Sequence, residues 1–146
     1  GNWQRVPTLE EALDVAGRAI GMILELKVEG IGNEACAIVK RTGFPGPLIY
    51  ASFLMPELQR VRQTDPDAKI MVLQHRRLPP DPVADVVALD ASHVGLHFST
   101  VTPMLLQTYH NLGRQVFVYT VNESQDIQRM RNLGVDGIIS DFQDRI

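Results

Sequence analysis

Strand and helix patterns alternate along this chain, and no other feature limits its possible folds as strongly. Helix signals separate six short apolar runs that favour β-strands. The runs cover residues 22–28, 48–52, 69–73, 93–98, 115–120 and 137–140. Consecutive strands that are joined through helices pair in parallel by right-handed crossovers. The sequence therefore predicts an α/β fold built on one parallel sheet.

The helices of this pattern have recognisable ends. Thr8 and Glu11 have the spacing of a capping box in "VPTLEEALDVAGRAIG", which predicts a helix before the first strand. Thr102 followed by proline is typical of a helix start, and Asn122 is expected to cap the last helix. Three prolines between residues 76 and 92 exclude a long helix there. The other helices are expected at 33–42, 56–64, 103–113 and 123–134.

Charged residues in the first strand distinguish between two parallel architectures. In "GMILELKVEG", residues 21–30, Glu25 and Lys27 alternate with Leu24 and Leu26, so the two charges share one face. A doubly wound sheet has helices on both faces, and an unpaired carboxylate buried there costs several kcal/mol. In a (β/α)₈ barrel, the inward face near the carboxyl ends of the strands is a polar active-site floor. The barrel is therefore favoured, although such barrels normally need about 250 residues and this chain has 146.

Composition adds limits on partners and location. The net charge is −3, and basic residues do not cluster beyond Arg76-Arg77, so nucleic acid is not an expected partner. No apolar run approaches the roughly 18 residues that a membrane span needs. Cys36 is the only cysteine, which excludes an internal disulfide and favours a reducing compartment. A cytoplasmic location is therefore expected, and membrane tethering by segments outside this chain stays open.

Several stretches resemble the glycerophosphodiester phosphodiesterase family. "ILELK" at 23–27 is similar to a family strand that carries a metal-binding Glu and a phosphate-binding Lys. "YASF" at 50–53 is similar to a strand end of that family, and "GRQVFVYTVNE" followed by "LGVDGIISD" is similar to its final motif. Two positions depart from the family pattern, because Tyr119 stands for the usual Trp and Asp141-Phe142 for the usual Asp-Pro. The resemblance spans nearly the whole chain.

The resemblance implies both a fold and an activity. It implies an incomplete TIM-barrel-type domain over residues 1–146, with about six of the eight strand–helix units and without the first two strands. Members of the family hydrolyse glycerophosphodiesters, which are small molecules of lipid and glycerol metabolism, to glycerol 3-phosphate and an alcohol. They use a divalent metal such as Mg²⁺ or Ca²⁺. The chain is therefore expected to belong to a phosphoric diester hydrolase.

The same resemblance implies roles for four residues. Glu25 corresponds to a metal ligand, and Lys27 corresponds to a phosphate contact. Ser52 and Tyr119 are expected to contribute to substrate binding. Other roles stay open for each of them. Glu25 and Lys27 can form a structural ion pair, and Ser52 and Tyr119 can serve only for packing.

The remaining polar residues are assigned no chemistry. The alternation of the fourth strand puts His93 and His97 on one face, where satisfied barrel histidines are expected. His75 is expected in a loop and His110 on a helix. Asp141 is expected to accept hydrogen bonds from loops at the end of the last strand.

Motifs of the family's first two strands do not occur in this sequence. They comprise His-Arg-Gly, a Glu-x-Asp metal pair and a second histidine, and the two histidines act as acid and base in such members. Glu25 alone cannot hold a hard cation, which takes several oxygen ligands. The metal site is thus expected to be incomplete, with no certain catalytic residue in this chain. The chain alone is expected to be inactive or nearly so.

Two other functions and one assembly stay open. The alternative to an enzyme is a non-catalytic barrel-like module that binds phosphorylated ligands or a protein partner. A doubly wound regulatory domain is a third possibility. A barrel that lacks two strands has open edges near 22–28 and 137–140, where unpaired backbone groups invite association. A homodimer through these edges is therefore expected.

Overall fold

The strands of the computed structural model lie where the apolar runs predict them. Residues 22–42 and 48–140 are described. The strands are β1 (Met22–Glu25), β2 (Leu48–Ser52), β3 (Lys69–Leu73), β4 (His93–His97), β5 (Gln115–Tyr119) and β6 (Gly137–Ile138). Between them lie α2 (Gly32–Thr42), α3 (Met55–Thr64), α4 (Ala84–Ala88), the 3₁₀ turn η2 (Phe98–Thr100), α5 (Pro103–Asn111) and α6 (Ser124–Leu133). The helix predicted around Thr8 and the predicted role of Asp141 fall outside the described residues.

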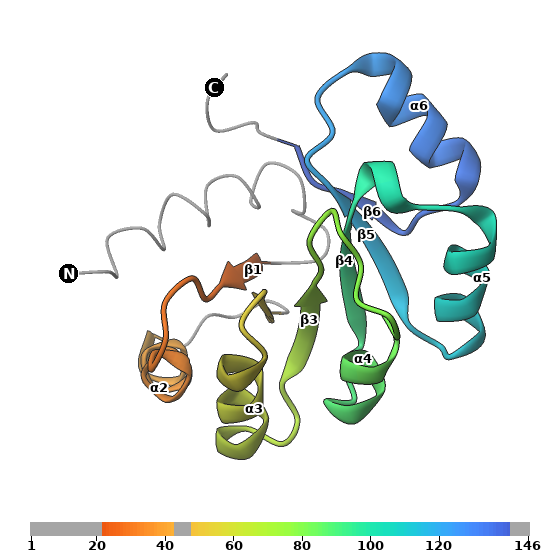
Figure 1. Ribbon diagram of the computed structural model, residues 1–146. Helices are drawn as coiled ribbons and strands as arrows, with labels where there is room; N and C mark the ends of the chain where they lie inside the picture. Colours follow the sequence, from red (N-terminus) through yellow and green to blue (C-terminus); the bar gives the residue numbers. More distant parts are fainter. Residues whose placement is uncertain (1–21, 43–47, 141–146) are drawn as a thin grey trace.

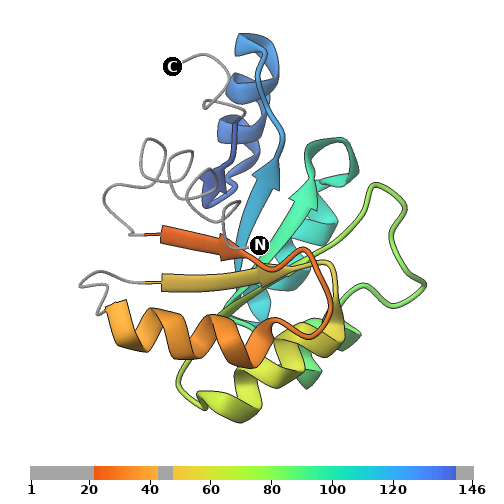
Figure 2. The same ribbon diagram turned by 90° about the vertical axis from the view of Figure 1, so that its left-hand side faces the viewer.

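All six strands are parallel, and they follow one another in the sheet in chain order. Figures 1 and 2 show that this sheet is curled and that the helices run along its outer side. A doubly wound sheet would instead reverse its strand order at a switch point and carry helices on both faces. The predicted incomplete TIM-barrel-type fold is therefore confirmed. We call the curled six-stranded sheet the half-barrel.

Several element ends differ from the prediction for local reasons. β1 stops at Glu25, so Lys27 follows the strand and does not lie within it. The proline-rich stretch does contain a helix, but α4 has only 5 residues. Asn122 lies one residue before the actual N-cap of α6, which is Glu123. Thr102 does cap α5 as predicted, because its hydroxyl accepts a hydrogen bond from the Leu105 N–H at 3.1 Å. None of the helices in the described ranges combines the length and apolar character needed to cross a bilayer.

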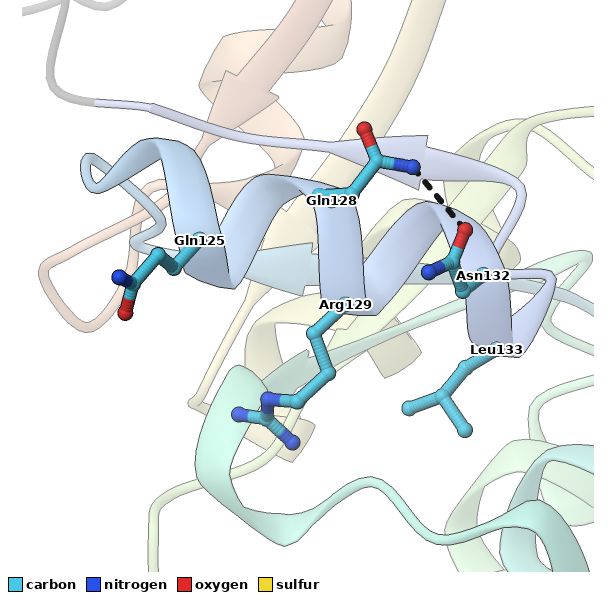
Figure 3. Close-up of a pocket in the computed structure, with 5 residues that line it drawn as sticks. All are labelled: Gln125, Gln128, Arg129, Asn132 and Leu133. Atoms are coloured by element: carbon cyan, nitrogen blue, oxygen red, sulfur yellow. Dashed lines mark hydrogen bonds between the residues drawn. The ribbon is translucent and has the colours of Figure 1, made fainter.

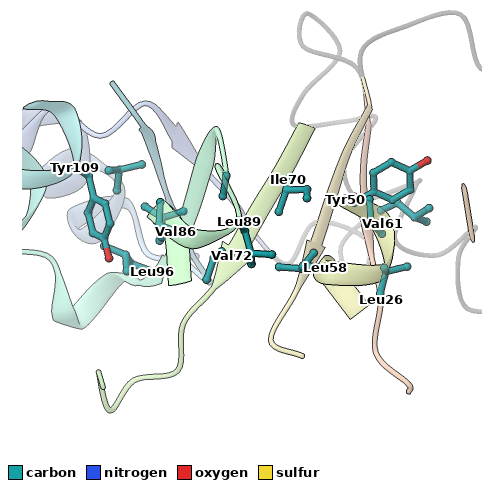
Figure 4. Packing of buried hydrophobic residues seen from close by; sticks show 14 of the residues in the cluster. Leu26, Tyr50, Leu58, Val61, Ile70, Val72, Val86, Leu89, Leu96 and Tyr109 are labelled. Carbon is teal, nitrogen blue, oxygen red and sulfur yellow. The ribbon is translucent and has the colours of Figure 1, made fainter. Parts of the chain in front are cut away.

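The larger apolar core lies between the half-barrel and its helices. Leu24 and Leu26 belong to it, as the alternation of the first strand predicts. Figure 4 shows side chains from the strands and the outer helices packed against one another in this layer. It includes Leu58 and Val61 from α3, Ile70 and Val72 from β3, Val86 from α4, Leu96 from β4 and Tyr109 from α5. Burial of these side chains holds the helices against the sheet.

A second, smaller cluster fills the concave side of the half-barrel. It consists of Ile23, Ile49, Ala51, Met71, Leu73 and Phe117, with Phe53 and Ile139 packed against it. The space is tight. A Cβ atom at Gly95 would lie 2.5 Å from a Leu73 methyl carbon, and one at Gly137 would lie 2.8 Å from the Phe117 ring. Glycine at these positions lets the larger neighbouring side chains occupy the interior.

A buried carboxylate joins α2 to α3. Glu57 is fully buried, and its oxygens accept hydrogen bonds from the N–H groups of Gly30, Ile31 and Gly32 at 2.8–2.9 Å. These N–H groups lie at the start of α2, where a helix offers them no internal partner. Burial alone would raise the pKa of Glu57, but the three N–H donors outweigh burial, and the pKa is lowered from 4.5. Glu57 is therefore a structural anion that caps the neighbouring helix.

We predict that Glu57→Gln lowers the free energy of unfolding by about 2 kcal/mol near pH 7, because a neutral amide cannot satisfy all three donors. The lowered pKa of Glu57 makes this contribution present above pH 4.5 and lost as the pH falls through the folded value. Urea unfolding across this range should show the two proteins converging in acid. Glu123→Gln, at an exposed position, is the matched control. Equal unfolding midpoints for wild type and Glu57→Gln near pH 7 would contradict the capping role.

Candidate active site

Five side chains gather at the carboxyl ends of five consecutive strands. Glu25 ends β1, Phe53 and His75 follow β2 and β3, His97 ends β4 and Tyr119 ends β5. Because the strands are parallel, these ends form one rim of the half-barrel, and active sites of such barrels lie at this rim. We call these five residues the rim cluster.

Ring contacts tie four members of the rim cluster together. The His75 ring stacks on Phe53 with 4.2 Å between the ring centroids. Phe53 meets Tyr119 edge-on at 5.9 Å, and Tyr119 meets His97 edge-on at 5.7 Å. Phe53 follows β2 whereas Tyr119 ends β5, and these strands are not neighbours in the sheet. Their contact therefore spans the concave side and shows how far the sheet curls.

Glu25 is a partly buried carboxylate beside this row of rings. Burial raises its pKa above 4.5, and the positive charge of Lys27 opposes that shift. The negative charge of Glu25 adds to burial in raising the pKa of Tyr119, so the two groups share one electrostatic environment. Lys27 is exposed, and none of the ion pairs within the described ranges joins it to Glu25. The two charges are thus near each other without a direct bridge.

Tyr119 is held by the segment that follows β3. Its hydroxyl donates a hydrogen bond to the backbone carbonyl of Gln74. Gln74 is itself fixed, because its N–H donates to the Gly95 carbonyl at 2.9 Å and its side-chain amide donates to the Pro82 carbonyl at 2.6 Å. The hydroxyl of Tyr109 is within hydrogen-bond distance of both the Gln74 side-chain oxygen and the Pro82 carbonyl. The position of Tyr119 therefore depends on a buried polar network beneath the rim.

Ser52 does not lie with the rim cluster. It is fully buried, and its hydroxyl donates to the Leu26 carbonyl at 2.6 Å and accepts from the Leu54 N–H at 2.9 Å. The inward residues of β2 are Ile49 and Ala51, so Ser52 lies on the helix-facing side. Both of its contacts are internal, and they leave the predicted substrate-binding role without geometric support. Ser52 instead fixes the backbone between Glu25 and Lys27.

The parallel strand order of the described residues agrees with the comparison to known proteins. The Glycerophosphoryl diester phosphodiesterase family matches residues 2–145 of the chain. The chain belongs to this family. A glycerophosphodiester phosphodiesterase of Caldanaerobacter subterraneus is 28% identical over 144 residues, which are 94% of this chain and 59% of that protein. One from Bacillus subtilis is 24% identical over 153 residues, covering 96% of this chain and 52% of that protein.

Solved structures show the same fold. A phosphodiesterase from Oleispira antarctica, in complex with the product sn-glycerol-3-phosphate, has a TM-score of 0.71 at 22% identity, covering 86% of this chain and 53% of that one. A glycerophosphodiester phosphodiesterase from Parabacteroides distasonis has a TM-score of 0.70 at 22% identity, covering 85% of this chain and 54% of that one. This member of the family thus spans between half and two thirds of the length of these relatives.

The metal expected from the family resemblance can be tested against the donor atoms present. Glu25 offers a carboxylate at the rim, which is the ligand type that Mg²⁺ and Ca²⁺ prefer. Within the described ranges, no group of three or more His, Cys, Asp or Glu side chains could hold a metal ion. Glu25 therefore fits one ligand position, and the described residues alone do not fit a complete site.

Other polar features of this family member lie away from the rim. His110 on α5 contacts Asp136 at 2.7 Å, and Asp136 also accepts from the Val116 N–H at 2.7 Å, which ties α5 to the start of β6. A shallow hollow lies on α6, lined by Gln125, Gln128, Arg129, Asn132 and Leu133 (Figure 3). Its amides bond to each other, with Gln128 donating to Asn132 at 3.0 Å. We assign neither feature to the active site.

Sequence reasoning missed part of the rim cluster. Phe53 was quoted only as part of the YASF motif, His75 was expected in a loop, and Gln74 was not singled out. Their positions could be read from the sequence, because all three lie within two residues of the end of β2 or β3. The contacts of these residues could not be read from the sequence, because they depend on the curl of the sheet and on the buried network around Gln74.

We predict that Glu25→Gln is more stable than wild type near pH 7. The raised pKa of Glu25 means that its favourable contribution is present below pH 4.5 and is lost as the pH rises through the folded value. The variant removes the charge that burial penalises, so the difference should shrink as the pH falls toward 4.5. Thermal unfolding between these two pH values measures it, with Glu29→Gln at an exposed site as control. A less stable Glu25→Gln would instead support a structural ion pair with Lys27.

Proposed function

We propose that this chain forms part of the active site of a phosphodiesterase that hydrolyses glycerophosphodiesters to glycerol 3-phosphate and an alcohol. Family membership supports the class of reaction. The observation that carries the proposal is Glu25, a carboxylate kept partly buried at the carboxyl rim, with the exposed Lys27 ammonium two residues further along. A partly buried acid with a raised pKa at such a rim is typical of functional sites.

Each residue has a distinct role in this proposal. Glu25 is one ligand of a divalent cation, either Mg²⁺ or Ca²⁺, which when bound polarises the phosphoryl group. The Lys27 ammonium contacts the phosphate and stabilises negative charge that develops on its oxygens. Tyr119 lines the pocket beside Glu25, held by its bond to Gln74. In this proposal further ligands and the groups that transfer protons come from outside this chain, so the chain alone is at most weakly active.

We predict that Lys27→Met weakens binding of inorganic phosphate and sn-glycerol 3-phosphate about tenfold, because the charged head is lost while the aliphatic stem is retained. Isothermal titration of the 146-residue chain measures the effect. Lys69→Met is the matched control, because Lys69 is also exposed but begins β3 at the opposite end of the half-barrel. Its affinity for phosphate should be unchanged.

Other outcomes would contradict this proposal or favour a non-catalytic binding module over an enzyme. Unfolding of Lys27→Met would mean that the lysine is structural. With added Mg²⁺ or Ca²⁺, wild type should hydrolyse glycerophosphocholine at no more than a trace rate. Robust turnover that is lost in Glu25→Ala would place the acid and base within this chain. Phosphate binding without any turnover, even when the remaining barrel is supplied, would favour a non-catalytic module.

We propose that the isolated chain self-associates. Within the described sheet, β1 and β6 each pair with one strand only, so each presents one row of backbone groups without a partner strand. Such edges invite pairing with another chain, and two-fold dimers are the commonest result. Light scattering at micromolar concentration should give the mass of a dimer. A mass of 16.3 kDa at every concentration would contradict this assembly.

A further inference from the structure

The ring of His97 offers one hydrogen-bond donor at the rim. Its Nδ1 accepts from the backbone N–H of Ser99 at 3.2 Å and lies 2.7 Å from the Ser99 hydroxyl. A backbone N–H can only donate, so Nδ1 has no proton and the neutral ring has its proton on Nε2. Burial and the positive charge of Arg76 lower the pKa of His97, which favours this neutral form. No acceptor for the Nε2 proton lies among the residues that the structure describes.

The hydroxyl of Tyr119 has the complementary property. Its proton is donated to the Gln74 carbonyl, so the lone pairs of the oxygen remain for a second partner. Gln74 cannot move away easily, because its backbone N–H and its side chain are both hydrogen-bonded. Burial and the negative charge of Glu25 raise the pKa of Tyr119, so its hydroxyl stays protonated and neutral. Tyr119 therefore presents a fixed acceptor.

The donor and the acceptor are neighbours. His97 and Tyr119 are register partners on the adjacent strands β4 and β5. Their rings are nearly perpendicular, at 84°, with the centroids 5.7 Å apart. Both side chains are only partly buried, so a ligand at the rim can approach them. The negative charge of Glu25 reaches Tyr119, and Glu25, His97 and Tyr119 all lie at the carboxyl ends of their strands.

We propose that His97 and Tyr119 together bind one hydroxyl group of the substrate, with the His97 Nε2–H donating to it and the Tyr119 oxygen accepting from it. A substrate hydroxyl can use both partners at once, because it both donates and accepts. A phosphate oxygen only accepts, and it would leave the Tyr119 oxygen facing another oxygen. An ammonium group only donates, and it would leave the His97 proton unpaired.

This inference rests on the proposed function and makes its substrate class more specific. We place this hydroxyl on the glycerol unit that carries the phosphate, because Tyr119 shares the rim with Glu25, the proposed metal ligand. Substrates with a free hydroxyl on that unit are favoured over those in which it is absent or esterified. His97 and Tyr119 are thus specificity-determining residues, separate from the groups that bind the metal and the phosphate.

The experiment compares two ligands that share a phosphate and differ in their hydroxyl groups. The ratio of the dissociation constants of n-propyl phosphate and sn-glycerol 3-phosphate is measured for the 146-residue chain by NMR titration. Wild type should prefer glycerol 3-phosphate about three- to tenfold for each hydrogen bond made. Tyr119→Phe and His97→Leu should each lower this ratio by that factor. His97→Gln, which keeps an N–H donor, should restore part of the preference.

The controls separate a direct contact from a disturbance of the fold. Tyr109→Phe removes a hydroxyl that also bonds to the Gln74 side chain but lies in the core between the sheet and α5, so the ratio should stay at its wild-type value. Wild type and Tyr119→Phe should bind inorganic phosphate with equal affinity, because Tyr119 is not assigned to the phosphate. The NMR spectra report directly whether each variant is folded.

The outcomes distinguish this inference from the function on which it rests. If wild type binds neither phosphate nor glycerol 3-phosphate, both are overturned. If wild type binds glycerol 3-phosphate and n-propyl phosphate equally, the proposed function stands and the hydroxyl site is overturned. A ratio that falls equally in Tyr119→Phe and Tyr109→Phe would overturn the direct contact, because the effect would then pass through Gln74.

Discussion

The concave side of the half-barrel has little room, and this steric constraint determines where chemistry can occur. Each parallel strand sends alternate side chains into a space that narrows because the sheet curls. Met71 and Leu73 fit beside β4 because residue 95 is glycine, and Phe117 fits beside β6 because residue 137 is glycine. Apart from His93, which is buried against Phe117 at the start of β4, the interior is filled mainly by apolar side chains, and the rim cluster lies at the carboxyl ends of the strands. The same apolar floor partly buries Glu25 and raises its pKa.

The inward and outward faces of a strand could be predicted from the sequence in β1, where charged residues mark one face. They could not be predicted in β2, which has no charged residues. In β1 the sequence Ile-Leu-Glu-Leu-Lys identifies the inward face, and the structure places Ile23 and Leu24 in opposite layers as expected. In β2 the sequence Leu-Ile-Tyr-Ala-Ser has no such alternation, so the direction of Ser52 could not be read from it. The resemblance to a family motif suggested a substrate contact. The serine hydroxyl is instead bonded within the protein.

The contacts of the rim cluster depend on geometry that no local pattern contains. Phe53 meets Tyr119 only because β2 and β5 are brought together across the curled sheet. The bond from Tyr119 to Gln74 depends on the path of the chain after β3, which the Pro82 carbonyl and Tyr109 fix from below. Strand positions, the Thr102 cap and the family could be predicted because they are local or depend on quoted motifs. The orientation of one ring toward another could not.

Two glutamates, both at least partly buried, show how the same residue type divides between stability and function. Glu57 accepts three backbone N–H groups and pairs with Arg60 at 3.4 Å, so its charge is satisfied within the protein and its pKa is lowered. Glu25 has no hydrogen bond from any described residue that could offset its burial, so its pKa is raised. A fold keeps such an unsatisfied carboxylate at a cost to stability. In the proposed function a bound cation would offset that cost, so the proposal links ligand binding to stability at Glu25 and not at Glu57.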